Sequence, residues 1–178
     1  KAMGVKETEE SRVAVGNVKP RIRMTLLYFV GNLEKRLVIG TSNKSELLMG
    51  YGTKYGDLGA DIYPLGDLYK TQVWQLAEFL GLPVEIVKKA PSPGLWKGQT
   101  TEGEIGKSYR QLDEILYALA DLEMTPAEVC ERLGYREADV RDLYERVRRN
   151  EHKRKMPTIT RLTRMCLDKD WRYPTERA

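Results

Sequence analysis

The chain has 178 residues, which suits one domain of ordinary size, long enough to bury a core. Its 30 lysines and arginines exceed its 26 acidic residues by only 30 − 26 = 4 charges, too small an excess to indicate nucleic-acid binding. Cys130 and Cys166 lie far apart and His152 is the only histidine, which argues against a zinc cluster and favours a reducing compartment. No apolar run approaches the ~20 residues that span a bilayer, and the first residues lack a signal-peptide pattern, so we expect a cytoplasmic protein without a membrane partner.

The first 40 residues are predicted to form a helix and a strand. Residues 1–16 are polar and lack sustained periodicity, so a loop or a frayed element is expected there. A four-residue apolar spacing from Val18 predicts a helix that ends near residues 31–32. Residues 37–39 are apolar and are closed by Gly40, a pattern that predicts a strand of a parallel sheet covered on both faces. Ligands of such sheets bind beyond the carboxyl ends of the strands.

Charged residues gather after that strand. Asn43 is predicted to cap a short helix, with Glu46 three residues on, as in a capping box. A glycine-punctuated loop follows and holds Lys54, Asp57 and Asp61, and residues 61–65 are predicted to be extended. A strand end, small residues and converging charges together predict a site that handles phosphate groups.

The second half of the chain is predicted to be mostly helical. Helices are indicated by apolar stripes, capping residues and stop signals at positions 73–80, before Pro91, and from Ser108, Thr125 and about residue 140 onward. Residues 91–106 combine proline, glycine, Trp96 and acidic residues, and we expect them to form a lid. The expected fold class is α/β, with a Rossmann-like parallel sheet of few strands, flanking helices and a helix-rich second half.

The first predicted helix carries more apolar surface than one short strand can cover. Its apolar residues include Leu26, Leu27, Phe29 and Val30. We therefore expect this helix to pack against its twin in a homodimer.

Several short segments, in their order and spacing, resemble the ammonia-dependent NAD synthetases, members of the adenine-nucleotide alpha-hydrolase-like group of pyrophosphate-forming ATP enzymes. The segments are GNVKPRIRM at 16–24, GT at 40–41 followed by Glu46, TKYGD at 53–57, GAD at 59–61, PL at 64–65 with Lys70, LWKGQT at 95–100 with Glu102, EIG at 104–106, and HK at 152–153 followed by Arg154. The resemblance covers almost the whole chain.

The family also carries, upstream, an SGGxDS loop that wraps the pyrophosphate of ATP, and this sequence contains no such motif. The resemblance therefore implies that residues 1–178 are the C-terminal portion of a single NAD synthetase domain whose ATP pyrophosphate-loop segment is missing. We expect an incomplete domain, which puts catalysis by this chain alone in doubt.

The resemblance implies a ligase that forms a C–N bond. ATP would activate the carboxylate of deamido-NAD as an adenylate, and ammonia would displace AMP to give NAD. Free ammonia is the expected nitrogen donor unless a separate protein delivers it, because neither cysteine has the setting of an amidase nucleophile. The implied site residues are Thr41, Lys70 and Ser92 for ATP, Glu46 for Mg²⁺, and Arg21, Lys54, Asp61, His152 and Lys153 for deamido-NAD.

Other interpretations of the same residues stay open. Glu46 is also explained as a capping carboxylate, and the basic run around His152 as a solvated helix end. Two capped helices over residues 125–149 imitate a helix-turn-helix reader of nucleic acid, although acidic residues interleave with the arginines. Another pyrophosphate-forming ATP enzyme and a non-catalytic remnant or partner subunit are the remaining alternatives.

Overall fold

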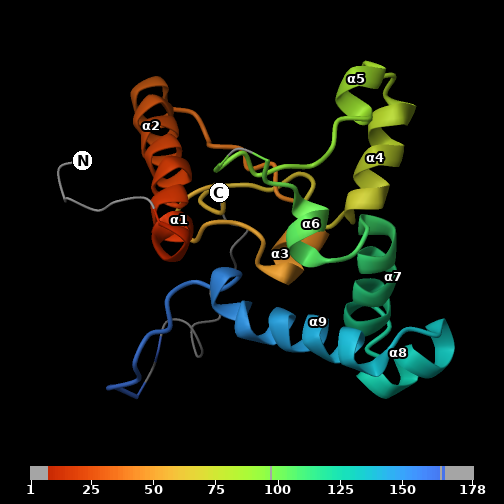
Figure 1. Cartoon of the computed structure of the whole chain (residues 1–178). Helices are drawn as coiled ribbons and strands as arrows, with labels where there is room; N and C mark the ends of the chain where they lie inside the picture. Colours follow the sequence, from red (N-terminus) through yellow and green to blue (C-terminus); the bar gives the residue numbers. More distant parts are fainter. Residues whose placement is uncertain (1–7, 97, 165, 167–178) are drawn as a thin grey trace.

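Helices dominate the structure of the chain, which we describe from a computed structural model covering residues 8–96, 98–164 and 166 (Figure 1). The helices are α1 (Glu9–Gly16), α2 (Val18–Glu34), α3 (Lys44–Met49), α4 (Lys70–Phe79), α5 (Val84–Val87), α6 (Thr101–Ile105), α7 (Tyr109–Ala120), α8 (Pro126–Leu133), α9 (Glu137–Arg149) and the 3₁₀ helix η1 (Glu151–Lys153). The helix-rich second half is thus confirmed. None of the helices within the described ranges is long and apolar enough to cross a membrane.

Extended backbone pairs at one place in the described part of the chain. A parallel bridge joins Ile39 to Ile62, with hydrogen bonds from Gly40 N to the Ile62 carbonyl and from Asp61 N to the Val38 carbonyl, both 2.9 Å. Residues 61–62 of the second segment predicted to be extended therefore lie beside residues 38–40, whereas residues 64–65 form a turn instead. Gly40 is required here because a Cβ would come within 2.4 Å of the Tyr63 ring. No longer strand is present among the described residues, so the Rossmann-like sheet stays a prediction.

The N-terminal prediction was wrong for residues 9–16, which form α1 rather than a loop. Thr8 and Ser11 form a reciprocal capping box at its start, and the helix packs against α2. These contacts replace the missing hydrophobic periodicity as the source of helix stability. Residues 1–7 of the same predicted segment lie outside the described part of the chain.

The core lies between α3 and the three long helices of the second half. Leu112, Ile115 and Leu116 on one face of α7 are almost fully buried, together with Met49 from α3 and Val129 from α8. The predicted starts of these helices are confirmed, because capping boxes begin α3 at Asn43, α7 at Ser108 and α8 at Thr125. In Figure 1, α9 runs beneath α3 and leads back toward the lower end of α2.

Candidate functional site: two adjoining cavities

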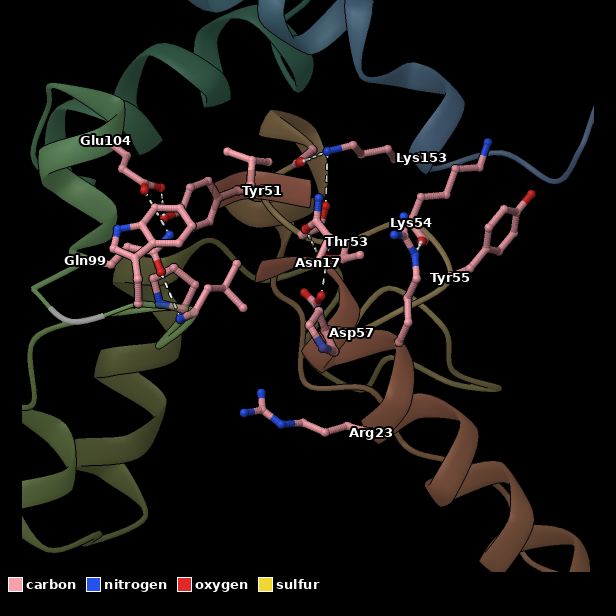
Figure 2. A pocket seen from close by; sticks show the side chains of 18 of the residues that line it. Asn17, Arg23, Tyr51, Thr53, Lys54, Tyr55, Asp57, Gln99, Glu104 and Lys153 are labelled. Carbon is pink, nitrogen blue, oxygen red and sulfur yellow. Dashed lines mark hydrogen bonds between the residues drawn. The ribbon is translucent and has the colours of Figure 1, made fainter. Parts of the chain in front are cut away.

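The larger of two neighbouring cavities, about 680 Å³, lies between the start of α2, the loop after α3, the 91–106 segment and η1 (Figure 2). Five lysines and arginines line it against two carboxylates, so it favours an anionic guest. The basic residues are Arg21, Arg23, Lys54, Arg146 and Lys153, the carboxylates are Asp57 and Glu104, and His152 also lines the wall.

Three of the residues predicted for deamido-NAD meet on one wall of this cavity. Lys54 Nζ lies 3.4 Å from Nδ1 of His152, although the two residues are 98 positions apart. Arg21 Nε donates a hydrogen bond to the Lys54 carbonyl at 3.3 Å, which ties α2 to the loop. All three side chains are exposed to the cavity or its mouth.

Lys153 and Arg154 hold the backbone of α3 and its following loop. Lys153 Nζ donates to the carbonyls of Gly50 at 2.7 Å and Gly52 at 3.1 Å, as Figure 2 shows. Arg154 donates to the carbonyls of Leu47 and Leu48, the last turn of α3. Burial lowers the pKa of the Lys153 ammonium, yet two carbonyls satisfy it. Within the basic run, Lys153 and Arg154 therefore cap the C-terminus of α3, whereas Arg148, Arg149 and Lys155 are exposed to solvent.

Asp61 lines neither of the two cavities. Its carboxylate accepts hydrogen bonds from the Tyr28 hydroxyl at 3.0 Å and from Val38 N at 2.7 Å. It therefore joins α2 to the extended segment before Gly40, and the structure does not bring it together with Lys54 and His152.

The smaller cavity, about 490 Å³, holds all four residues predicted for ATP and magnesium. Thr41 follows the Ile39–Ile62 bridge by two residues, Glu46 lies on α3, Lys70 begins α4 and Ser92 lies near the start of the 91–106 segment. Lys70 Nζ lies 3.9 Å from Glu46 Oε1. This cavity is therefore formed where the extended segment after Ile39 meets the first turns of α3 and α4.

Glu46 divides its two carboxylate oxygens between two tasks. Oε2 accepts the Asn43 N–H at 3.2 Å and so completes the capping box, while Oε1 faces Lys70. Burial raises the pKa of the Glu46 carboxyl, and the nearby Lys70 ammonium opposes that rise. The described residues contain no group of three or more histidines, cysteines or acids that could hold a metal by themselves. A single carboxylate oxygen fits Mg²⁺ if phosphates and waters complete its shell.

Tyr51, Asp57 and Pro93 line both cavities and form their common wall. Sequence reasoning gave Tyr51 and Pro93 no role and left Asp57 unassigned, although Asp57 belongs to the TKYGD segment that signalled the site. Asp57 accepts the Thr53 N–H at 2.9 Å and so shapes the loop around it. The two cavities therefore adjoin.

The predicted lid contributes to both cavities and is anchored on both sides. Glu104 accepts hydrogen bonds from the Tyr51 hydroxyl at 2.6 Å and from Gln99 Nε2 at 2.9 Å (Figure 2). Lys19 donates to the Leu95 carbonyl at 2.5 Å, and the Arg12 guanidinium lies over the Trp96 ring. The segment thus spans from α1 and α2 to the loop after α3; its opening and closing stay a prediction.

Known proteins are similar to this chain over most of its length. A family model described as NAD synthase matches residues 2–157. The NH(3)-dependent NAD(+) synthetase of Sulfurisphaera tokodaii is 48% identical over 165 residues, which is 93% of this chain and 59% of that protein. A synthetase of the same name from Thermococcus kodakarensis is 51% identical over 144 residues, 81% of this chain and 57% of that protein.

Two solved structures are similar as well. NMN synthetase from Francisella tularensis superposes with a TM-score of 0.70 at 38% identity, covering 89% of this chain and 59% of that one. NH3-dependent NAD synthetase from Campylobacter jejuni, in complex with nitrate, superposes with a TM-score of 0.69 at 38% identity, covering 90% and 59%. The chain therefore spans about three fifths of the length of such relatives, 59% of the Sulfurisphaera protein and 63% of one from Saccharolobus solfataricus. Because the family model covers most of its length and these relatives share nearly half of the aligned residues, the chain belongs to the NAD synthase family.

Proposed function

We propose that the chain is part of an ammonia-dependent NAD synthetase, which amidates deamido-NAD at the expense of ATP and releases AMP and pyrophosphate. The observation that carries the proposal is the pair of adjoining cavities with Tyr51, Asp57 and Pro93 in common. Adenylation joins an atom of one substrate to an atom of the other, so the two binding sites must meet. The names of the similar proteins support the same reaction.

In the first step, a carboxylate oxygen of deamido-NAD attacks the α-phosphorus of ATP and pyrophosphate leaves. Negative charge moves onto the leaving group, so a fixed cation at the phosphates lowers the barrier. Lys70 supplies that cation at the smaller cavity, and the hydroxyl of Thr41 provides a further hydrogen bond there. The Ser92 hydroxyl donates to the Gln99 carbonyl at 2.6 Å, so it would have to give up that bond to donate to a phosphate. In the second step, ammonia attacks the acyl carbon, AMP leaves, and the attacking nitrogen loses a proton.

Glu46 is the proposed magnesium ligand, through the oxygen that does not serve the cap of α3. Magnesium bound there would neutralise charge on the phosphate oxygens of ATP. Lys70 Nζ lies 3.9 Å from the same oxygen, and its positive charge favours the ionised form of the Glu46 carboxyl that a metal requires.

The larger cavity is the proposed site for deamido-NAD, whose phosphates and carboxylate are anionic. We propose that Arg21, Lys54 and His152, which line this cavity, contact the substrate directly. We propose that Lys153 acts chiefly by holding the glycine loop, because its ammonium donates hydrogen bonds to two backbone carbonyls of that loop. The predicted contact of Asp61 with the substrate has no support from either cavity.

The relatives are longer than this chain, and we propose that sequence outside it supplies the SGGxDS loop of the same domain. The same region would add strands to the Ile39–Ile62 pair and complete the adenine-nucleotide alpha-hydrolase-like sheet. Leu37 and Ile39, which are 71% and 62% exposed, offer the apolar surface for that packing. The cytoplasmic location stays a prediction.

The similarity to NMN synthetase makes nicotinate mononucleotide a second candidate substrate. It carries the same carboxylate and would be adenylated by the same chemistry. A dinucleotide would use the additional basic residues of the larger cavity, such as Arg23 and Arg146, which favours deamido-NAD as the first choice.

The reaction itself is the first test. Incubation of the chain, joined to an upstream SGGxDS segment, with ATP, Mg²⁺, ammonium chloride and deamido-NAD is expected to yield NAD, AMP and pyrophosphate in equal amounts, resolved by anion-exchange chromatography. Glutamine in place of ammonium should yield no NAD. Faster turnover of nicotinate mononucleotide would reassign the substrate, and AMP formation without any nicotinate substrate would indicate another pyrophosphate-forming enzyme. A protein that makes no product, even with an upstream SGGxDS segment restored, would be a non-catalytic relative.

Reciprocal substitutions test the assignment of the two cavities. Lys70→Met is expected to weaken ATP binding about 10-fold or more, because a charge-assisted hydrogen bond contributes about 1.5–3 kcal/mol. Lys54→Met should weaken deamido-NAD binding to a similar degree, and each variant should leave the other ligand within about twofold. Titration calorimetry with each ligand measures both. Equal losses for both ligands in both variants would contradict separate sites.

The raised pKa of Glu46 predicts a pH-dependent stability difference. Its ordinary pKa is 4.5 and burial raises it in the folded state, so the folded protein binds the proton more tightly than the unfolded chain. The free energy of unfolding of the wild type, relative to Glu46→Gln, should therefore fall as the pH rises from 4 through the raised pKa. Glutamine keeps an oxygen for the Asn43 cap and serves as the matched control. Urea unfolding at several pH values without Mg²⁺ measures the difference, and a constant or rising difference would refute the prediction.

The apolar face of α2 supports the proposed homodimer. Leu26, Leu27, Phe29 and Val30 are between 46% and 64% exposed. Leu27→Glu combined with Phe29→Glu is expected to halve the mass seen by light scattering, because two charges would be buried at the interface. Leu80→Glu, at a leucine that is 62% exposed outside α2, serves as the control and should leave the mass unchanged. A dimer that survives the double substitution would exclude α2 as the interface.

A further inference from the structure

One buried carboxylate, which lines neither of the two cavities, accepts hydrogen bonds from α3 and α4, the helices that carry Glu46 and Lys70. Asp113, in the middle of α7, is 5% exposed. Its Oδ1 accepts the Ser45 hydroxyl at 2.5 Å, and its Oδ2 accepts Thr71 N at 2.9 Å and the Thr71 hydroxyl at 2.8 Å. Because burying a carboxylate is costly unless donors satisfy it, these contacts fix the three residues relative to one another.

The contacts reach the Glu46–Lys70 pair through the residues directly beside it. Ser45 precedes Glu46, and Thr71 follows Lys70. Lys70 N also donates to Ser45 Oγ at 2.9 Å, so the hydroxyl of Ser45 accepts from Lys70 and donates to Asp113. Ser45 is fully buried, which leaves this hydroxyl no water to replace either partner.

The same helix also supports the side chain of Lys70. Lys70 Nζ lies 5.8 Å from the centre of the Tyr109 ring, one turn before Asp113 on α7, and Trp74 of α4 packs edge-on against that ring. A negative charge beside the first N–H groups of α4 is favourable, because the helix dipole is positive there. Helix α7 thus holds both the backbone and the ammonium of Lys70.

We propose that Asp113 is a positioning residue of the ATP site: through Ser45 and Thr71 it sets the place of Lys70 opposite Glu46, where the phosphates bind. This inference rests on the proposed function. Helix α7 contributes no residue to the wall of the smaller cavity. The proposal nevertheless gives α7 control over how tightly that cavity binds a nucleotide.

Asp113→Asn tests the proposal. Asparagine replaces one carboxylate oxygen by an NH₂ group, which cannot accept the hydrogen bond that Ser45 or Thr71 donates at that position. ATP binding with Mg²⁺ is expected to weaken about 10-fold or more, as is typical when the partner of a site residue is replaced. Binding of deamido-NAD should stay within about twofold. In a Lys70→Met background the same substitution should change ATP binding less than twofold, because Asp113 acts through Lys70. The matched control is Asp139→Asn on α9, which removes the negative charge that pairs with Arg136 and Lys107. It should change neither affinity.

The outcomes separate this inference from the proposed function. If the wild type, with an upstream SGGxDS segment restored, does not bind ATP, the proposed function is wrong. If the wild type binds ATP and Asp113→Asn binds it equally well, loses both ligands equally, or shows an additive loss in the Lys70→Met background, the positioning role is wrong. Should Asp113→Asn fail to fold by circular dichroism, Ser45→Ala replaces it with the same expected results, since it interrupts the link from Lys70 N to Asp113.

Discussion

The hydrogen bonds of Asp113 are the contact on which the smaller cavity depends. They join α3 and α4 at their first turns and attach both to α7, the centre of the core. Glu46 and Lys70 come from segments 24 positions apart, and their geometry is only as fixed as the helices that carry them. A buried carboxylate with three donors is well suited to this task, since losing any one of them removes part of the compensation for burying the charge.

Helix α3 links that contact to the larger cavity. It has six residues, too few for stability on its own, so contacts at both ends must hold it. Asn43 and the Glu46 side chain cap its first turn. Arg154 caps its last turn by donating hydrogen bonds to the carbonyls there. The loop that leaves α3 at Gly50 then carries Lys54 and Asp57 to the larger cavity. One short helix thus sets the distance between the two proposed substrates.

The sequence predicted those features that depend on interactions between residues close together in the chain. The capping residues Asn43, Ser108 and Thr125 start helices where expected, because a side chain that satisfies the first free N–H groups acts within four residues. Gly40 marked the end of the extended segment correctly. Helix α1 was not predicted because its stability comes from packing on α2 rather than from its own apolar spacing.

Long-range contacts were not predictable in the same way. The basic run at 152–155 reads as a solvated helix end, and nothing near it in sequence shows that Lys153 and Arg154 bind carbonyls about 100 positions earlier. Asp113 offered one signal, a charged residue between the buried leucine and isoleucine of an amphipathic helix, but its partners lie on α3 and α4. The family pattern grouped Asp61 with Lys54, whereas folding turned its carboxylate toward Tyr28 and Val38.

Nucleic-acid binding through α8 and α9 has little support from the structure. Arginines of α9 pair with acidic residues of the same helix, as in Arg141 with Glu137 and Arg148 with Glu145, and Arg146 faces the larger cavity.

The central claim is instead that ATP and a nicotinate nucleotide occupy adjoining cavities. A crystal structure with Mg²⁺ and a non-hydrolysable ATP analogue tests this most directly. The account predicts phosphate oxygens within hydrogen-bond distance of Lys70 and a metal on Glu46; a triphosphate bound instead beside Lys54 and His152 would contradict it.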